Sequence, residues 1–228
     1  MKKIILSFAS LLLTLPVLAQ EPEQEPEPEP KPVPLSELAA AADLIAVVRV
    51  LDTDYQYTRE FPSGGSAFLR VLIPYKVGRP LEDIIEVYEE GLHAGECYFE
   101  NPTVLEEGRR HLVFLKFSPD VKDQYNGLDA GCKLDVLVMT DNRYALRYPP
   151  NGIDLADDLS GLASEMAFRD GYAVLNEDQI TPPERIRLVE SGYLSPEGEK
   201  FRFTHGIDMA EIRKLMGSDA LTLDRSLK

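Results

Sequence analysis

Short apolar runs, many of them rich in β-branched residues, dominate the chain between residues 44 and 148. Residues 44–51 form a near-continuous apolar run of the kind that is typical of a buried strand. In residues 83–89, Ile85 and Val87 share one face of an extended chain. The pattern predicts strands at residues 44–51, 67–77, 83–89, 110–117, 133–140 and 143–148.

Glycine and proline mark the breaks between these strands. Residues 62–66 contain two glycines and predict a loop, and residues 78–80 end the strand before them. Pro74 lies inside a predicted strand and lacks a backbone donor, so it requires a strand edge or a bulge. Asp141 and Asn142 tolerate the positive φ of a tight turn, which predicts a hairpin between the last two strands.

Helical signals flank the strands. Ser36 is a suitable N-cap for a short helix at residues 37–42. After residue 150 the sequence predicts three further helices, one from an apolar stripe and two from capping boxes. Their marker residues are Leu155, Leu159, Leu162 and Met166, then Thr181–Glu184, then Asp208–Glu211.

The predicted fold class is mainly β with an α-helical C-terminal extension, that is, an OB-like small β-barrel plus short helices. No βαβ rhythm is present in the sequence, which argues against a parallel α/β sheet. We divide the chain into a signal peptide, an acidic Pro/Glu-rich spacer, an OB-like β-barrel domain and a helical C-terminal extension. Their ranges are residues 1–19, 20–34, 35–150 and 151–228.

The first residues have the pattern of an export signal. Lys2 and Lys3 precede an apolar stretch at residues 4–18, and Ala19 offers a small residue for cleavage before Gln20. An uncleaved membrane anchor is the alternative, but a membrane span requires about 20 apolar residues. We therefore expect a periplasmic or secreted protein that has no stable membrane anchor after signal cleavage.

Residues 21–34 alternate proline with glutamate. Proline removes backbone donors and the glutamates repel one another, so we expect an extended, solvated spacer of polyproline-II type. A peptide ligand for an aromatic groove on a partner is the alternative interpretation.

The chain as a whole is acidic. Its 24 lysines and arginines are outnumbered by 39 aspartates and glutamates, which gives a formal net charge of −15. A nucleic-acid-binding protein gains much of its affinity by neutralising phosphates with cationic side chains, so we expect no nucleic acid partner. The acidic surplus favours solubility and cationic partners in general.

Several segments together carry a family resemblance: Ala42–Val50, Tyr75–Gly78, Cys97–Phe99, and Glu107–Leu115, which is followed by Cys132. In order and rough spacing they resemble the netrin/TIMP-like family of OB-fold modules, bacterial secreted type, over residues 36–150. The resemblance implies an OB fold. Family members that inhibit metalloproteases chelate the catalytic zinc through an N-terminal cysteine, which has no counterpart here. The resemblance therefore does not carry that mechanism over to this chain.

Cys97 and Cys132 are the two cysteines of the chain. An even number of cysteines in an exported protein indicates a disulfide bond, which would tie the irregular stretch at residues 91–108 to the hairpin that follows. A redox pair is the alternative, although the chain contains no C-x-x-C motif.

We predict no cofactor, no metal site and no catalytic residue. His93, Glu96 and Cys97 are close in sequence and are candidate metal ligands, and His111 is a more distant candidate. Zinc sites, however, require several ligands at short spacing. We expect His111 to be a partly buried strand residue.

The other candidates for chemistry are expected to be solvated. His205 is placed in a turn, and residues 120–129 lack the spacing of a calcium loop. Glu86, Glu89 and Glu90 are expected to face water. Motifs of nucleophilic catalysis and of phosphate loops are absent from the sequence.

The preferred hypothesis is an exported, soluble, non-enzymatic protein-interaction module of netrin/TIMP-like OB fold, whose partner is an unidentified protein. The alternative is an exported hydrolase whose site assembles only in space, in a cavity that holds a histidine beside a nucleophile or carboxylate. An anchoring role in the cell envelope is a third hypothesis, which depends on an uncleaved signal.

Overall fold

The computed structural model describes residues 31–93, 95–103 and 107–217. The predicted signal peptide, its cleavage position between Ala19 and Gln20, and the spacer up to residue 30 lie outside the described residues. In the described part of the chain, no helix is both long and apolar enough to cross a membrane.

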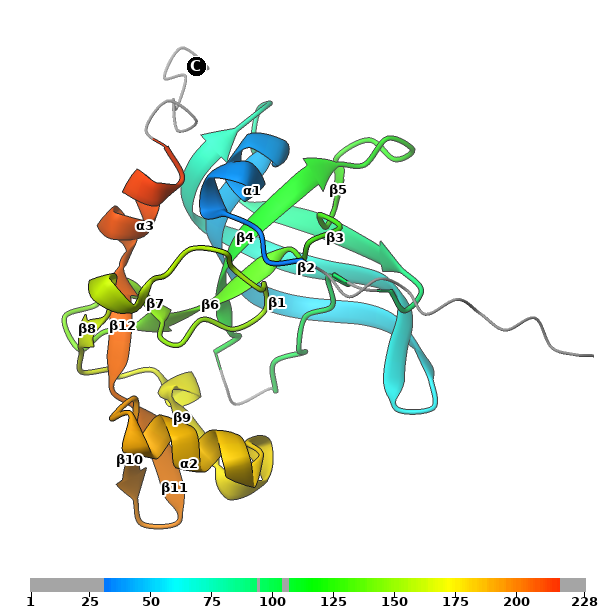
Figure 1. Cartoon of the computed structure of the whole chain (residues 1–228). Coiled ribbons are helices and arrows are strands. Elements are labelled where there is room, and N and C mark those ends of the chain that lie inside the picture. The colour runs from blue at the N-terminus through cyan, green and yellow to red at the C-terminus, as the bar shows by residue number, and fades with distance from the viewer. Residues whose placement is uncertain (1–30, 94, 104–106, 218–228) are drawn as a thin grey trace, which may run out of the picture.

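Strands β1 to β5 form a small barrel (Figure 1). The strands are β1 Leu44–Thr58, β2 Phe61–Val77, β3 Ile84–Glu90, β4 Arg110–Phe117 and β5 Gln124–Asn126. β2 pairs with β1 and β3, and β4 pairs with β1 and β5, all in antiparallel orientation. A parallel pairing of β3 with β5 completes the circuit. The predicted small β-barrel is confirmed.

The sheet continues beyond the barrel because β4 pairs with β5 over its last residues and with β6 over its first. Three further strands then follow β6 in the sheet. In spatial order, the strands from β6 onwards are β6 Lys133–Val138, β7 Tyr144–Arg147, β12 His205–Asp208 and β8 Ser164–Glu165. The C-terminal segment therefore contributes β8 and β12 to the same nine-stranded sheet as the barrel.

The remaining elements are short. A second sheet lies beside α2 and forms with it what we call the C-terminal lobe, residues 171–203 (Figure 1). Its strands are β9 Val174–Asn176, β10 Leu194–Glu197 and β11 Lys200–Phe203. The helices are α1 Leu35–Ala41, α2 Pro182–Glu190 and α3 Met209–Leu215, with 3-10 turns η1 Ser160–Leu162, η2 Gly171–Ala173 and η3 Glu177–Gln179.

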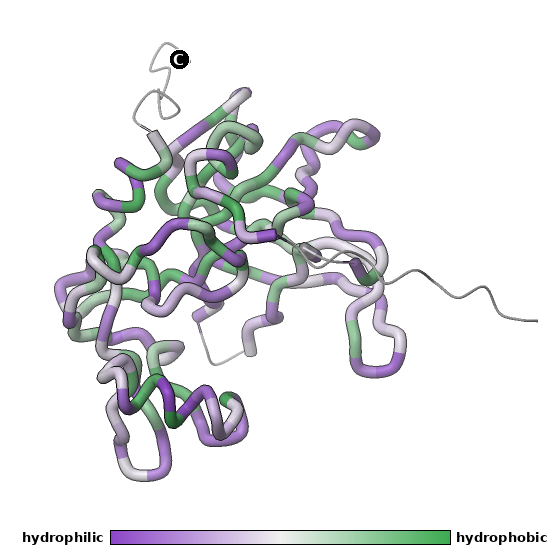
Figure 2. The backbone as a smooth tube through the Cα atoms, viewed as in Figure 1, coloured by the Kyte–Doolittle hydropathy of each residue, from purple (hydrophilic) through white to green (hydrophobic). Residues whose placement is uncertain are grey.

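β1 is buried on both faces because it separates two hydrophobic cores. Ile45 and Val47 face a core that includes residues of α1 and α3, whereas Ala46 and Val48 face the barrel interior. All four side chains are fully buried. Figure 2 shows hydrophobic segments running through the crossing strands, while the outer loops are mostly hydrophilic. Removal of this apolar surface from water is the main contribution to folding.

Several predicted features of the strands are confirmed. β4 spans the predicted residues 110–117. The register of β1 and β2 shifts where Pro74 pairs with Ala46, which is the predicted bulge. Asn142 has a φ of 69° in the turn between β6 and β7.

Two loop predictions need correction. Residues 62–66 belong to β2, and Gly65 permits a close approach of β1 instead of a turn: a Cβ there would lie 2.2 Å from the carbonyl oxygen of Asp54. Residues 120–129 contain the short strand β5, whose Tyr125 is buried.

The helix predictions have mixed outcomes. α2 begins at Pro182, and Asp208 caps α3 by accepting a hydrogen bond from the backbone N–H of Ala210 at 2.8 Å. The helix predicted from the stripe between residues 155 and 166 is wrong, because that backbone contains only η1 and β8. Its leucines pack on the core from an irregular segment.

Ser36 does not cap the first helix. α1 already begins at Leu35, whose backbone N–H donates a hydrogen bond of 2.7 Å to the side chain of Asp157. The cap is therefore supplied from a distant part of the sequence.

Candidate functional site

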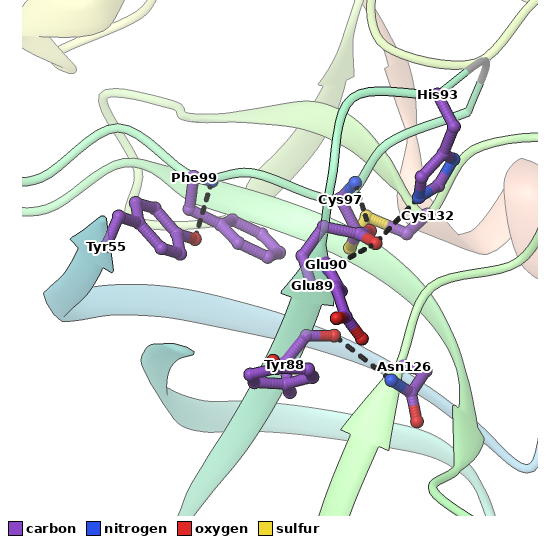
Figure 3. The surroundings of a disulfide bond; sticks show 9 residues. All are labelled: Tyr55, Tyr88, Glu89, Glu90, His93, Cys97, Phe99, Asn126 and Cys132. Atoms are coloured by element: carbon purple, nitrogen blue, oxygen red, sulfur yellow. Dashed lines mark hydrogen bonds and ion pairs between the residues drawn. A yellow bond between two sulfur atoms is a disulfide. The ribbon is translucent and has the colours of Figure 1, made fainter. Parts of the chain in front are cut away.

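Cys97 and Cys132 form a disulfide bond, as predicted (Figure 3). Their Cα atoms lie 5.6 Å apart, and both residues are buried. The bond joins the irregular segment after β3 to the beginning of β6. Because it uses both thiols, Cys97 is not available as a metal ligand.

Glu89 is buried under the disulfide-bonded segment, so the prediction that it faces water is wrong (Figure 3). Its carboxylate accepts hydrogen bonds from the backbone N–H groups of Cys97, at 2.7 Å, and Glu90, at 3.1 Å. Nε2 of His93 lies 2.8 Å from the same carboxylate. Glu89 lies on the inward face of β3, because side chains alternate along a strand. Glu86 is half-buried, and Glu90 is exposed as predicted.

Glu89→Gln is expected to lower the free energy of unfolding by about 1–3 kcal/mol, because the amide offers one acceptor oxygen where the carboxylate offers two. Urea unfolding followed by circular dichroism measures the loss. Glu90→Gln removes the same charge from an exposed neighbour and is the matched control. Equal stability of the two variants would contradict the anchoring role of Glu89.

The three histidines of the chain lie apart. His93 follows β3, His111 is buried within β4, and His205 in β12 packs edge-on against Tyr193. None of them lines any of the five best-formed cavities of the described residues. Those residues also include no group of three His, Cys, Asp or Glu side chains arranged to hold a metal ion. These five cavities therefore do not bring a histidine beside a nucleophile or carboxylate, and the hydrolase hypothesis stays an untested alternative.

His111 belongs to a buried polar cluster. Its Nδ1 lies 3.2 Å from Oδ1 of Asp135, yet neither ring nitrogen has a well-directed hydrogen bond. Burial lowers the pKa of His111, and the neighbouring Asp135 opposes this only in part. Burial also lowers the pKa of Lys133 to about 8, although Asp135 attracts its charge. The Nζ of Lys133 lies 4.7 Å from the ring centroid of Phe99.

Lys133→Met is expected to raise the free energy of unfolding at pH 7 by about 1–3 kcal/mol, because it removes a charge that burial disfavours. In the wild-type protein this cost is fully present below pH 8. It disappears as the pH rises from about 8 to 10.5, because the unfolded chain binds the proton more tightly there. Urea unfolding across this pH range measures the free energy of unfolding. It should rise more steeply with pH for the wild-type protein than for Lys133→Met. Lys122→Met, at a side chain that is 90% exposed, is the control.

A cavity of about 410 Å³ lies between the barrel and the C-terminal lobe. We call it the interlobe cleft. Its walls come from the start of β4, the end of β6, the segment 169–172, β9 and β11. Its charged lining residues are the cationic Arg109, Arg110, Arg169 and Lys200 and the acidic Glu100, Glu107 and Asp170.

Arg110 is buried at this cleft. Its guanidinium donates hydrogen bonds to Glu107 and, at 3.4 Å, to Asp170, whereas its Nε is buried without a hydrogen-bond partner. Hydrogen bonding to Arg110 lowers the pKa of Glu107. Asp170 also accepts hydrogen bonds from the backbone N–H groups of Val138, at 3.2 Å, and Tyr172, at 3.1 Å.

The other cations of the cleft differ in their pairing. The Nε of Arg109 lies 2.7 Å from a carboxylate oxygen of Glu100, and its guanidinium lies 4.7 Å from the ring centroid of Tyr172. Arg169 and Lys200 are exposed and form no ion pair or hydrogen bond through their side chains with the residues that the structure describes. The acidic groups of the cleft thus have direct partners, whereas Arg169 and Lys200 have none among the described residues, although the charge of Arg169 helps to lower the pKa of Glu107.

The β1–β2 hairpin extends past the barrel (Figure 1). The pairing of β1 with β4 ends at Arg49, and the pairing of β2 with β3 begins at Gly64. Residues 57–62, which we call the hairpin tip, therefore pair only with one another within the described residues. Tyr57 and Phe61 of the tip are 59% and 62% exposed. The exposed charged residues of the tip and its surroundings are Asp52, Asp54, Arg59, Glu60 and Glu90.

Comparison of the chain with family models, with curated proteins and with solved structures found no match. The function is therefore inferred from the geometry of the molecule.

Sequence reasoning missed the interlobe cleft. Arg109 and Arg110 entered only as part of a strand motif, while Arg169 and Lys200 are distant in sequence. One local signal was present: strand alternation places Arg110 on the same face as buried Leu112. A buried guanidinium requires acidic partners, so an arginine at an inward strand position indicates a buried ion pair.

Proposed function

We propose that this protein is an exported, non-enzymatic protein-interaction module, built on an OB-type barrel, that presents its hairpin tip to a partner protein. The spatial strand order β1-β2-β3-β5-β4, closed by β1–β4 pairing, supports an OB fold, because that fold is a five-stranded Greek-key barrel. The segments Ala42–Val50 and Glu107–Leu115, which suggested a netrin/TIMP-like relationship, overlap β1 and β4 of this barrel.

Two features support a periplasmic or secreted location. The N-terminal sequence has the pattern of an export signal, and the disulfide bond between Cys97 and Cys132 persists best in an oxidising compartment.

The observation that carries the proposal is the exposure of Tyr57 and Phe61 on the hairpin tip. Aromatic side chains dominate the binding energy of many protein interfaces, because each buries a large area at low cost in conformational entropy. Around the tip, the acidic Asp54, Glu60 and Glu90 outnumber the single cation Arg59, so the fitting partner offers an apolar pocket with a cationic rim. Opposite charges at the rim accelerate association, and salt weakens this effect.

Chemical crosslinking in the native cell envelope tests the proposal. Wild-type protein should capture a reproducible partner, and Tyr57→Ser with Phe61→Ser should reduce the captured amount by at least about tenfold. Val121→Ser changes an exposed apolar residue in the loop after β4, so this control should capture the partner normally. Undiminished capture by the tip variant would refute the hairpin tip as the contact surface.

A further inference from the structure

We propose that the interlobe cleft is a binding site for a small ligand that carries two or more carboxylate groups. This inference concerns a different surface from the hairpin tip and does not depend on the proposed protein partner.

The charge distribution of the cleft is the first argument. The chain has a formal net charge of −15, yet four cationic side chains line this one cavity. Arg169 and Lys200 form no ion pair or side-chain hydrogen bond within the described structure. Lys200 lies in β11 of the C-terminal lobe, and Arg169 lies just before η2, where the lobe begins. Two cations without an ion-pair partner on a concave surface attract an anion more strongly than the same cations on a convex one.

Arg110 supplies the second argument, because its side chain lines the cleft and one of its donors is unused. The residue is only 8% exposed, and its two terminal nitrogens already contact Glu107 and Asp170. Its Nε is buried without a hydrogen-bond partner. A buried donor in this state is unfavourable, because it has lost its hydrogen bonds to water and gained none in the protein. An acceptor oxygen of a ligand would satisfy it once the exposed side chain of Glu107 turns away and the guanidinium shifts, because the Nε itself is closed to solvent.

The chain itself indicates that the acceptor is a carboxylate. The carboxylates of Glu100 and Glu107 already contact the guanidinium groups of Arg109 and Arg110. Both glutamate side chains are mostly exposed, 64% and 66%, so they can turn towards water when a ligand competes for the arginines. A planar guanidinium matches a planar carboxylate through two parallel hydrogen bonds.

The size and lining of the cleft limit the ligand to a small polar molecule. The volume of about 410 Å³ lies at the lower end of the range for ligand pockets. Asn176 and Gln179 add amide groups to the wall, and a capping box between them fixes their position. Tyr172, whose ring lies under the guanidinium of Arg109, also lines the cleft.

Isothermal titration calorimetry of the purified exported chain at low ionic strength tests the inference. The probes are propane-1,2,3-tricarboxylate, glutarate and inorganic phosphate. We expect the tricarboxylate to bind with a Kd below about 1 mM, and phosphate to bind more weakly than either carboxylate. Arg169→Gln with Lys200→Gln should weaken tricarboxylate binding by at least about tenfold.

The matched control is Lys122→Gln with Arg213→Gln, which removes the same charge from exposed positions that do not line the cleft. Its affinity should equal that of the wild-type protein. The proposal is overturned by absence of binding up to about 10 mM. It is equally overturned by preferential binding of phosphate, or by equal losses of affinity in the cleft variant and the control.

Discussion

Gly108→Ala is expected to lower the free energy of unfolding by about 3 kcal/mol or more. A Cβ at this position would lie 1.8 Å from the carbonyl oxygen of Val50. Val50 belongs to β1, and Gly108 and Arg109 directly precede β4. Next to the close contact, the N–H of Val50 donates a hydrogen bond of 3.0 Å to the carbonyl oxygen of Arg109. The backbone of β1 must therefore separate from the chain entering β4. Urea unfolding monitored by circular dichroism measures the change.

Gly161→Ala is the control, because a Cβ there meets no atom within 4 Å. It should leave the unfolding midpoint almost unchanged. If Gly108→Ala were equally harmless, the close contact between the two backbones would be wrong. Because Gly108 precedes Arg109 and Arg110, its substitution should also weaken tricarboxylate binding in the interlobe cleft.

Loss of the disulfide bond should have a comparably large effect. Cys97→Ala with Cys132→Ala opens a link across 35 residues, and in the chain-entropy model this costs about 3–4 kcal/mol. The free energy of unfolding, measured in urea with and without a reductant, tests the value.

Reduction of the wild-type protein should shift its unfolding midpoint towards that of the double variant, while the reductant should leave the variant unchanged. An unchanged midpoint after complete reduction, verified by intact mass, would show that the bond does not stabilise the fold. Glu89 connects this prediction with the earlier one, because it holds the backbone of Cys97 in the oxidised protein.

The strands were predictable where their side chains are buried in the two hydrophobic cores. β4 was located at its observed bounds, because its apolar residues alternate between two buried faces. The predicted helix at residues 155–166 failed for a related reason: leucines at helical spacing also pack on a core from an irregular chain. Spacing alone does not distinguish the two cases, since both bury the same apolar area.

The candidate site was much less predictable than the strands. Arg110 was visible as a charge at an inward strand position, but its partner Asp170 lies 60 residues away. The sequence predicts that Glu89 faces water, because glutamates of an amphipathic strand are usually exposed. Only the fold of the disulfide-bonded segment over β3 shows that the backbone of Cys97 and the side chain of His93 contact it.

The sequence by itself determined the mainly β architecture and the pairing of its two cysteines. The alternation of apolar residues is visible within short segments, and two cysteines in one chain allow a single intramolecular pairing. The tertiary structure alone decided which charges share the interlobe cleft and that the hairpin tip extends beyond the barrel. Both depend on strand register and on the packing of the C-terminal lobe against β4 and β6. Contacts between residues far apart in sequence leave no periodic trace, so only folding brings them together.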